Sequence, residues 1–130
     1  MKELVKIRYR SVISHGEEKM SDVYEGDAWH QWQLSKEMFC FEHPQYGEMS
    51  IEIRGNELTL KHGTSVLNLV LNQKIKNLYS LPYGNIQIEA VLKRLNISKT
   101  RCSIVYYLYD RGQILSKCYL TIDVINTDLS

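Results

Sequence analysis

The clearest pattern in the chain is an alternation of apolar and polar residues with a period of two. It runs almost unbroken from residue 85 to residue 125, and turn sequences at 96–100 and 110–113 divide it into three segments. The apolar series are Ile86, Ile88, Ala90 and Leu92; Ile104, Tyr106 and Leu108; and Ile114, Cys118, Leu120, Ile122 and Val124. Successive side chains of a strand point to opposite faces, so each series predicts a strand with one buried face.

Shorter segments of the same kind fill the rest of the chain. Further strands are predicted over about 2–13, 19–34, 38–42, 48–54, 58–61, 65–71 and 75–81. Turn residues separate them, as at Gly55-Asn56, Gly63 and Pro82-Tyr83-Gly84. Connections this short place each strand antiparallel beside the next, which gives a meander.

A flat meander of this length would leave two long edges and one unburied apolar face. Curling the sheet into a barrel removes both problems. We therefore predict an all-β protein in which residues 1–130 form one domain. Its fold would be an antiparallel, lipocalin-like barrel of about eight to ten strands, closed or nearly closed, with a two-sheet sandwich as the alternative.

Gly26 stands in the middle of the second predicted strand. A mid-strand glycine is typical of a place where a long barrel strand bends or bulges. The alternative is a hairpin turn at Gly26-Asp27, which would divide the segment into two strands.

Charge and composition argue against several classes of protein. The chain has 16 basic and 15 acidic residues, whereas a protein that binds nucleic acid usually gathers a basic excess on one face. Lys6, Arg8 and Arg10 alternate with apolar residues, which indicates the solvent side of a strand. No stretch approaches the roughly eighteen apolar residues of a membrane helix. We expect neither a nucleic acid nor a membrane as partner.

The three cysteines, Cys40, Cys102 and Cys118, are an odd number without a short metal-ligand spacing. All three lie within strand patterns. The charged first ten residues leave no room for the apolar core of a secretion signal. We interpret the cysteines as reduced, packed thiols of a cytoplasmic protein.

Three segments resemble a known family. Leu78–Ile86 (LYSLPYGNI) contains its tyrosine-x-x-proline-tyrosine-glycine element, Gly55–Gly63 is similar to its central hairpin, and Leu115–Ile122 is similar to its last strand. The family is the YwiB-like group of small bacterial β-barrel proteins. The resemblance implies a barrel of the calycin, or lipocalin-like, type and a capacity to bind a ligand. Ser35-Lys36-Glu37 departs from the family's glycine-containing turn after the second strand.

Catalytic chemistry finds little support in the residues. The chain has four histidines, His15, His30, His43 and His62. His15 and His43 fall in predicted turns, where we expect them to be solvated, and His62 ends a strand with inward parity. No serine-centred elbow or glycine-rich phosphate loop accompanies any of them. We therefore expect no enzymatic activity.

Acidic residues cluster at Asp22, Glu25 and Asp27 in the second segment. Asp22 has the parity of the inner face, whereas the other two have the solvent parity. Because a metal ion needs several ligands that converge, we expect no metal or cofactor site.

A small apolar or amphipathic ligand is the expected partner. The inward-facing residues are nearly all large, so the interior is mostly filled and a pocket is expected at one end. The candidate ligand-binding residues are Tyr9, Tyr24, Trp32, His62 and Tyr106. The polar residues with inward parity are Ser11, His62, Arg94 and Ser116. His62 and Arg94 are predicted at opposite rims.

The strand around residues 104–109 has apolar residues on both faces. Val105, Tyr107 and Tyr109 have the outward parity. Another segment of the chain would cover them, or a homodimer or a partner protein would. This face therefore supports the alternative function, a filled barrel that acts as a protein–protein interaction module.

Overall fold

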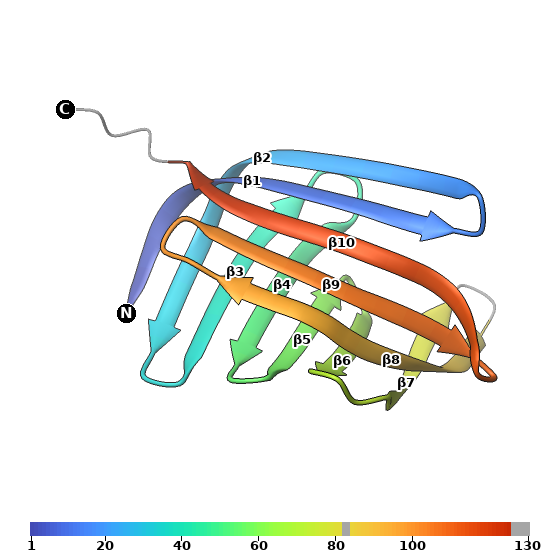
Figure 1. Cartoon of the computed structure of the whole chain (residues 1–130). Coiled ribbons are helices and arrows are strands. Elements are labelled where there is room, and N and C mark those ends of the chain that lie inside the picture. Colours follow the sequence, from blue (N-terminus) through green and yellow to red (C-terminus); the bar gives the residue numbers. More distant parts are fainter. Residues whose placement is uncertain (82–83, 126–130) are drawn as a thin grey trace.

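The structure is a computed structural model that describes residues 1–81 and 84–125, and of residues 79–81 only the main chain. Ten strands follow one another along the chain (Figure 1). They are β1 (Lys2–His15), β2 (Glu18–Gln33), β3 (Lys36–His43), β4 (Gly47–Arg54), β5 (Glu57–His62), β6 (Ser65–Val70), β7 (Ile75–Leu81), β8 (Gly84–Ile97), β9 (Arg101–Asp110) and β10 (Gln113–Ile125). Pro82 and Tyr83 of the predicted seventh turn lie outside the described residues. The described part contains no helix long and apolar enough to span a membrane.

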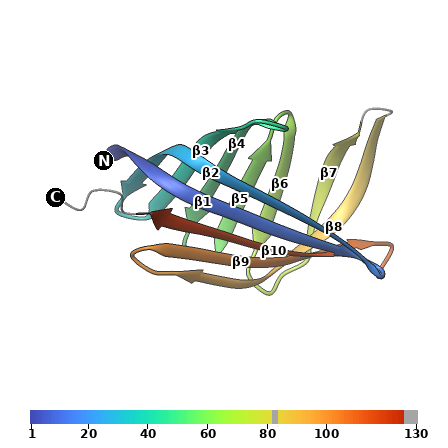
Figure 2. The ribbon, with the colours of Figure 1, turned by 90° about the horizontal axis from the view of Figure 1, so that it is seen from above.

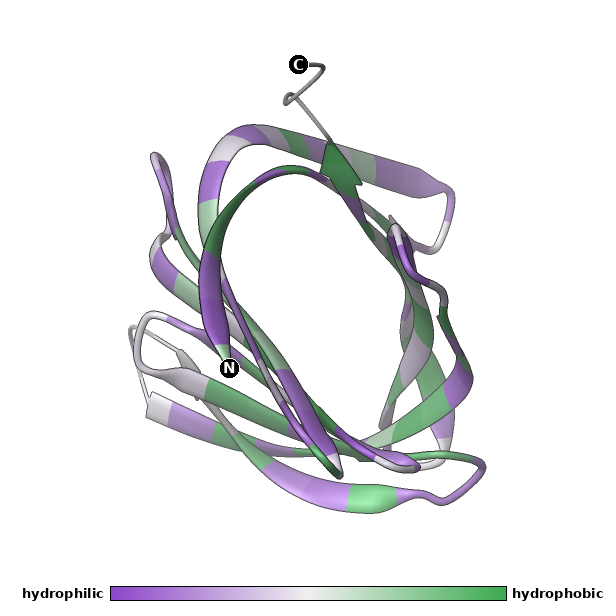
Figure 3. Cartoon of the chain, turned by 90° about the vertical axis from the view of Figure 1, so that its left-hand side faces the viewer, coloured by the Kyte–Doolittle hydropathy of each residue, from purple (hydrophilic) through white to green (hydrophobic). Residues whose placement is uncertain are grey.

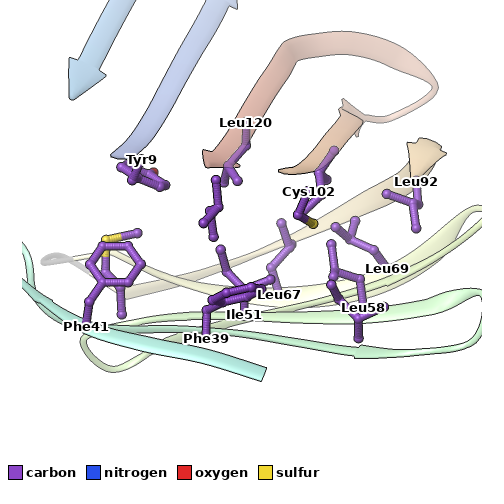
Figure 4. Packing of buried hydrophobic residues seen from close by; sticks show 14 of the residues in the cluster. Tyr9, Phe39, Phe41, Ile51, Leu58, Leu67, Leu69, Leu92, Cys102 and Leu120 are labelled. Atoms are coloured by element: carbon purple, nitrogen blue, oxygen red, sulfur yellow. The ribbon is translucent and has the colours of Figure 1, made fainter. Parts of the chain in front are cut away.

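All ten strands belong to one antiparallel sheet, in the order β6-β5-β4-β3-β2-β1-β10-β9-β8-β7. Viewed end-on, the sheet curls around a common axis (Figure 3). Labelled side chains of β1 and β8–β10 point toward those of β3–β6 across the interior (Figure 4). The largest side chains with under 2% exposure are Ile7, Ile51, Leu58, Leu69, Leu92, Ile104 and Ile122. The predicted meander in a nearly closed barrel is confirmed, and the sandwich is excluded.

A side-chain amide joins the two ends of the sheet at the β6–β7 seam. The Asn68 backbone N–H donates to Oδ1 of Asn77 at 2.8 Å, and Nδ2 of Asn77 donates to the Asn68 carbonyl at 2.9 Å. Asn77 is only 5% exposed. Its amide therefore takes the place of a peptide group from a neighbouring strand. Nearby, the Asn72 N–H donates to the Leu92 carbonyl at 2.9 Å, which ties the β6–β7 connection to β8.

β2 is one continuous strand that bends along its length (Figures 1 and 2), so the predicted bend is confirmed and the hairpin at Gly26-Asp27 is excluded. The Tyr24 ring stacks on Phe41 of β3, with the ring centres 5.0 Å apart. A Cβ atom at Gly26 would lie 2.5 Å from the Tyr24 hydroxyl oxygen. The glycine is therefore needed because the Tyr24 ring lies over it.

Replacing Gly26 with alanine is expected to lower the free energy of unfolding by about 1 kcal/mol, because the new methyl group displaces the stacked ring. In a Tyr24→Ala background the three atoms closest to the new methyl group are gone, and the same change is expected to be neutral or stabilising, because alanine lowers the entropy of the unfolded chain. Urea denaturation of the wild type, the two single variants and the double variant gives the coupling free energy between the two positions. An equal cost in both backgrounds would disprove this account of Gly26.

A β-bulge in β8 reverses the predicted parity of its second half. The register shifts between Leu92 and Arg94, so Lys93 is the extra residue. Arg94 is exposed and Leu95 packs against the core instead. The prediction that Arg94 faces inward was therefore wrong. Ile86 is also 38% exposed rather than buried.

A second bulge lies at the start of β10, where the register shifts between Ile114 and Ser116. Ile114 is 52% exposed, although its parity matches the buried residues that follow. Leu115 packs against the core in its place. The predicted inward position of Ile114 was wrong for the same reason as that of Arg94: one extra residue moves the side chains beyond it to the other face.

Candidate functional site

A cavity of about 190 Å³ lies inside the barrel beside the first half of β2. Seven strands line it, and its apolar residues include Tyr9, Ile51, Leu60, Leu67, Tyr106 and Leu120. The register explains how three of these meet. Ile51 pairs with Leu60, and Leu60 pairs with Leu67, so they form a row across β4, β5 and β6 on the inner face.

The cavity borders a split between β2 and β3. The ladder between these strands extends only from Trp29–Cys40 to Gln33–Lys36. Beyond it, side chains connect the strands: Tyr24 stacks on Phe41, and His43 Nε2 lies 2.6 Å from Asp22 Oδ2.

His43 is the last residue of β3 and is only 5% exposed. The prediction of a solvated turn histidine was wrong, because β3 runs one residue further than its apolar pattern indicates. The signal in the sequence was parity, since Phe39, Phe41 and His43 share one face. Asp22 faces inward as predicted, while Glu25 and Asp27 form outer ion pairs with Arg8 and Lys6.

Hydrogen bonds determine the tautomer of His43. The Gln45 backbone N–H donates to Nδ1 at 3.0 Å, so Nδ1 is an acceptor. Nε2 therefore carries the proton of the neutral ring and donates it to Asp22. Both ring nitrogens are thus engaged. The Tyr46 ring lies between His43 and His62, with ring-centre distances of 4.6 and 4.5 Å.

His62 contributes an available imidazole to the cavity wall. It contacts the Tyr46 ring and forms no hydrogen bond with any residue that the structure describes. Burial lowers its pKa below 6.5, and the neighbouring His43 lowers it further, while Asp22 opposes the shift. The ring is therefore neutral near pH 7 and can both donate and accept a hydrogen bond.

Burial also keeps two other titratable groups of the lining uncharged at neutral pH. Burial raises the pKa of the Tyr9 hydroxyl and raises that of the Cys118 thiol to about 11. Among the residues that the structure describes, Asp22 is the one carboxylate in the lining. Lys61 also belongs to the lining, but it is exposed and its parity places it on the outer face of β5. The inner surface is therefore mostly apolar, with a few uncharged polar groups and one negative group at its edge.

The structure brings three of the five candidate ligand residues together. Tyr9, His62 and Tyr106 all line the cavity. Tyr24 lies outside it, and its hydroxyl donates to the Asp27 carbonyl at 3.0 Å. Trp32 lies elsewhere, with its ring 4.9 Å from that of His30 in the second half of β2.

The other inward polar residues are also divided. Ser11 lines the cavity, whereas Ser116 is buried outside it, with its hydroxyl 3.5 Å from His15 Nδ1. Tyr46 was not predicted, because it lies in a turn outside any alternating segment.

Val105, Tyr107 and Tyr109 are half-buried on the outer face of β9. Lysines of the same chain cover the two rings. The Nζ atoms of Lys93 and Lys117 lie 5.4 and 5.3 Å from the centre of the Tyr107 ring. Side chains of the same chain therefore account for the partial burial of the outer face of β9. Tyr109 has the same cover, with Lys74 Nζ at 4.4 Å.

Within the two described ranges, no group of three or more histidine, cysteine or acidic side chains is arranged to hold a metal ion. All three cysteines are free thiols.

Comparison with known proteins places the chain in a family. The model of a domain of unknown function, DUF1934, matches residues 5–122. The chain belongs to this family. The crystal structure of the ywiB protein from Bacillus subtilis has a similar fold, with a TM-score of 0.72 and 12% identity over 96% of this chain and 94% of that one. Both findings confirm the YwiB-like resemblance. No curated protein matches the sequence.

Proposed function

We propose that the protein binds one small amphipathic molecule in the cavity between β1, β2, β4–β6, β9 and β10. The observation that carries the proposal is the combination of an apolar interior space with Asp22 and His62 in its lining. Small-molecule sites typically are concave, mostly apolar and equipped with a few polar groups that orient the ligand.

The size of the cavity limits the ligand. At about 190 Å³ it is smaller than a typical drug site of roughly 300–1,000 Å³. It is close to the roughly 150 Å³ that suffices for benzene in an engineered apolar cavity. The ligand is therefore a molecule with one ring or a short branched chain.

The polar groups favour a cationic or hydrogen-bond-donating head group. The Asp22 carboxylate attracts a cation, and the tyrosine rings of the lining present faces that attract it as well. Neutral His62 accepts a hydrogen bond from the same head group. A ligand carboxylate would be repelled by Asp22.

Several features support binding rather than catalysis. Both nitrogens of His43 are already engaged, and the raised pKa of Cys118 keeps its thiol protonated. The lysine cover of Tyr107 and Tyr109 favours the interior over the outer face of β9 as the functional surface. Free thiols fit a reducing compartment such as the cytoplasm.

Calorimetric titration with benzylamine, benzyl alcohol and benzoate tests the proposal. We expect benzylamine to bind most tightly, benzyl alcohol more weakly and benzoate not measurably. Asp22→Asn keeps an acceptor for His43, and we expect it to weaken benzylamine about tenfold while leaving benzyl alcohol unchanged. Failure of all three probes to bind would contradict the proposed function. Binding of benzylamine and benzoate with equal affinity would contradict the assigned head group.

A further inference from the structure

The first half of β2 has an edge without main-chain pairing, and among the described residues only the side chains of Tyr24 and Asp22 reach β3 there, on the inner face. Residues 18–28 pair with β1 on one side, and β3 joins the other side only from Trp29 onward. Besides the ladder with β1, the described residues make one hydrogen bond to the main chain of this stretch. The Tyr24 hydroxyl donates it to the Asp27 carbonyl. Unpaired main-chain groups along a strand of this length form a template for another strand.

We propose that this edge pairs with the same edge of a second copy of the chain, antiparallel about a two-fold axis at Val23. Val23 is the midpoint of the free edge 18–28 and is 60% exposed on the outer face. A two-fold axis at this position pairs the entire free edge and stops where β3 begins. An interface of this kind is isologous, so each contact occurs twice.

The charges along the edge are complementary in this register. Lys19 of each copy lies opposite Asp27 of the other, and Ser21 lies opposite Glu25. Lys19 is exposed, and the Asp27 side chain is 57% exposed beside Lys6. Opposite charges in direct cross-strand positions stabilise an antiparallel pair, and like charges destabilise it.

The neighbouring registers are less favourable. The inner faces of the two β2 strands must lie on the same side of the joint sheet. The two-fold axis can therefore pass through a residue but not between two residues. An axis at Asp22 would place two Asp22 carboxylates opposite each other. An axis at Tyr24 would place Lys19 opposite Trp29, whose main-chain groups already pair with β3, so the new ladder would be shorter. The position at Val23 avoids both conflicts.

The same pairing reaches the rim of the cavity. With the axis at Val23, Asp22 lies opposite Tyr24 of the second copy on the inner face. Asp22 and its neighbour Ser21 line the cavity. Dimerisation therefore adds a tyrosine beside the one carboxylate of the lining, whether or not a ligand is present.

Sedimentation equilibrium over a concentration series, with reciprocal charge reversals, tests the proposal. The wild-type chain is expected to form a dimer. Lys19→Asp and Asp27→Lys each place like charges opposite each other, and each is expected to weaken the dimer about tenfold. An equimolar mixture of the two variants restores opposite charges in a heterodimer, and the double variant restores them in a homodimer. Lys99→Asp, an exposed turn position away from the edge, is the control and should leave the dimer unchanged.

The restored heterodimer separates loss of pairing from loss of folding, because Asp27→Lys also removes the ion pair with Lys6. A wild-type chain that stays monomeric throughout the series would overturn the proposal. It would show that the charged residues along this edge of β2 prevent pairing with a second copy. A dimer that neither reversal weakens would place the contact on another surface. A mixture that remains as weak as the single variants would exclude the register.

Discussion

Replacing Asn77 with alanine is expected to lower the free energy of unfolding by about 3 kcal/mol. The amide of Asn77 satisfies the N–H and C=O of Asn68 at the β6–β7 seam and also donates to the Ile75 carbonyl at 3.2 Å. Its removal empties the buried position of the Asn77 side chain and leaves the main-chain N–H and C=O of Asn68 without a partner in the sheet. Losing the partner of a partly buried polar group costs more than an average hydrogen bond contributes. Urea denaturation measures the loss, and hydrogen exchange should show lower protection in β6 and β7.

Asn68→Ala is the matched control. Its side chain is exposed and takes part in one hydrogen bond, from Thr59 at 3.2 Å, while its main-chain groups remain available to Asn77. We expect this change to cost less than about 1 kcal/mol. If the two substitutions were equally costly, the seam would not depend on the Asn77 amide.

Replacing Leu60 with tryptophan is expected to weaken benzylamine binding by about a hundredfold or more, because the indole fills the space that the ring of the ligand would occupy. Leu60 is half-buried in the middle of the row that crosses β4, β5 and β6. A cavity that accepts part of the indole limits the change in stability to within about 2 kcal/mol. Calorimetry and urea denaturation give the two values.

Leu95→Trp is the control for the size of the new side chain. Leu95 is also a half-buried leucine that packs against the core, but it does not line the cavity. We expect this variant to lose stability and to keep its affinity for benzylamine. Full affinity in Leu60→Trp would show that the ligand binds elsewhere.

The alternating pattern was sufficient to predict the strands and the barrel, because burial of one face imposes a period of two on each segment. It failed where the main chain inserts an extra residue. Bulges at Lys93 and Leu115 reverse the parity around them, and nothing in the residue types themselves marks these positions. Local pattern carries no information on which residue stays unpaired.

The candidate site was predictable only in part, for a related reason. Tyr9, His62 and Tyr106 carry inward parity, so the pattern found them. Their common location depends on register and strand tilt, which also place Trp32 away from them. The role of His43 depends on a split between two strands that are adjacent along the chain. Such a split is a tertiary feature without a local sequence signal.

A methionine methyl NMR spectrum recorded during a benzylamine titration tests the central claim most directly. Met49 is 8% exposed and lines the cavity together with the exposed Met20, whereas Met1 and Met38 do not. The account predicts a saturable shift of the Met49 methyl signal, accompanied by that of Met20, while the signals of Met1 and Met38 stay in place. An unchanged Met49 signal, or shifts confined to Met1 and Met38, would contradict a ligand site inside the barrel.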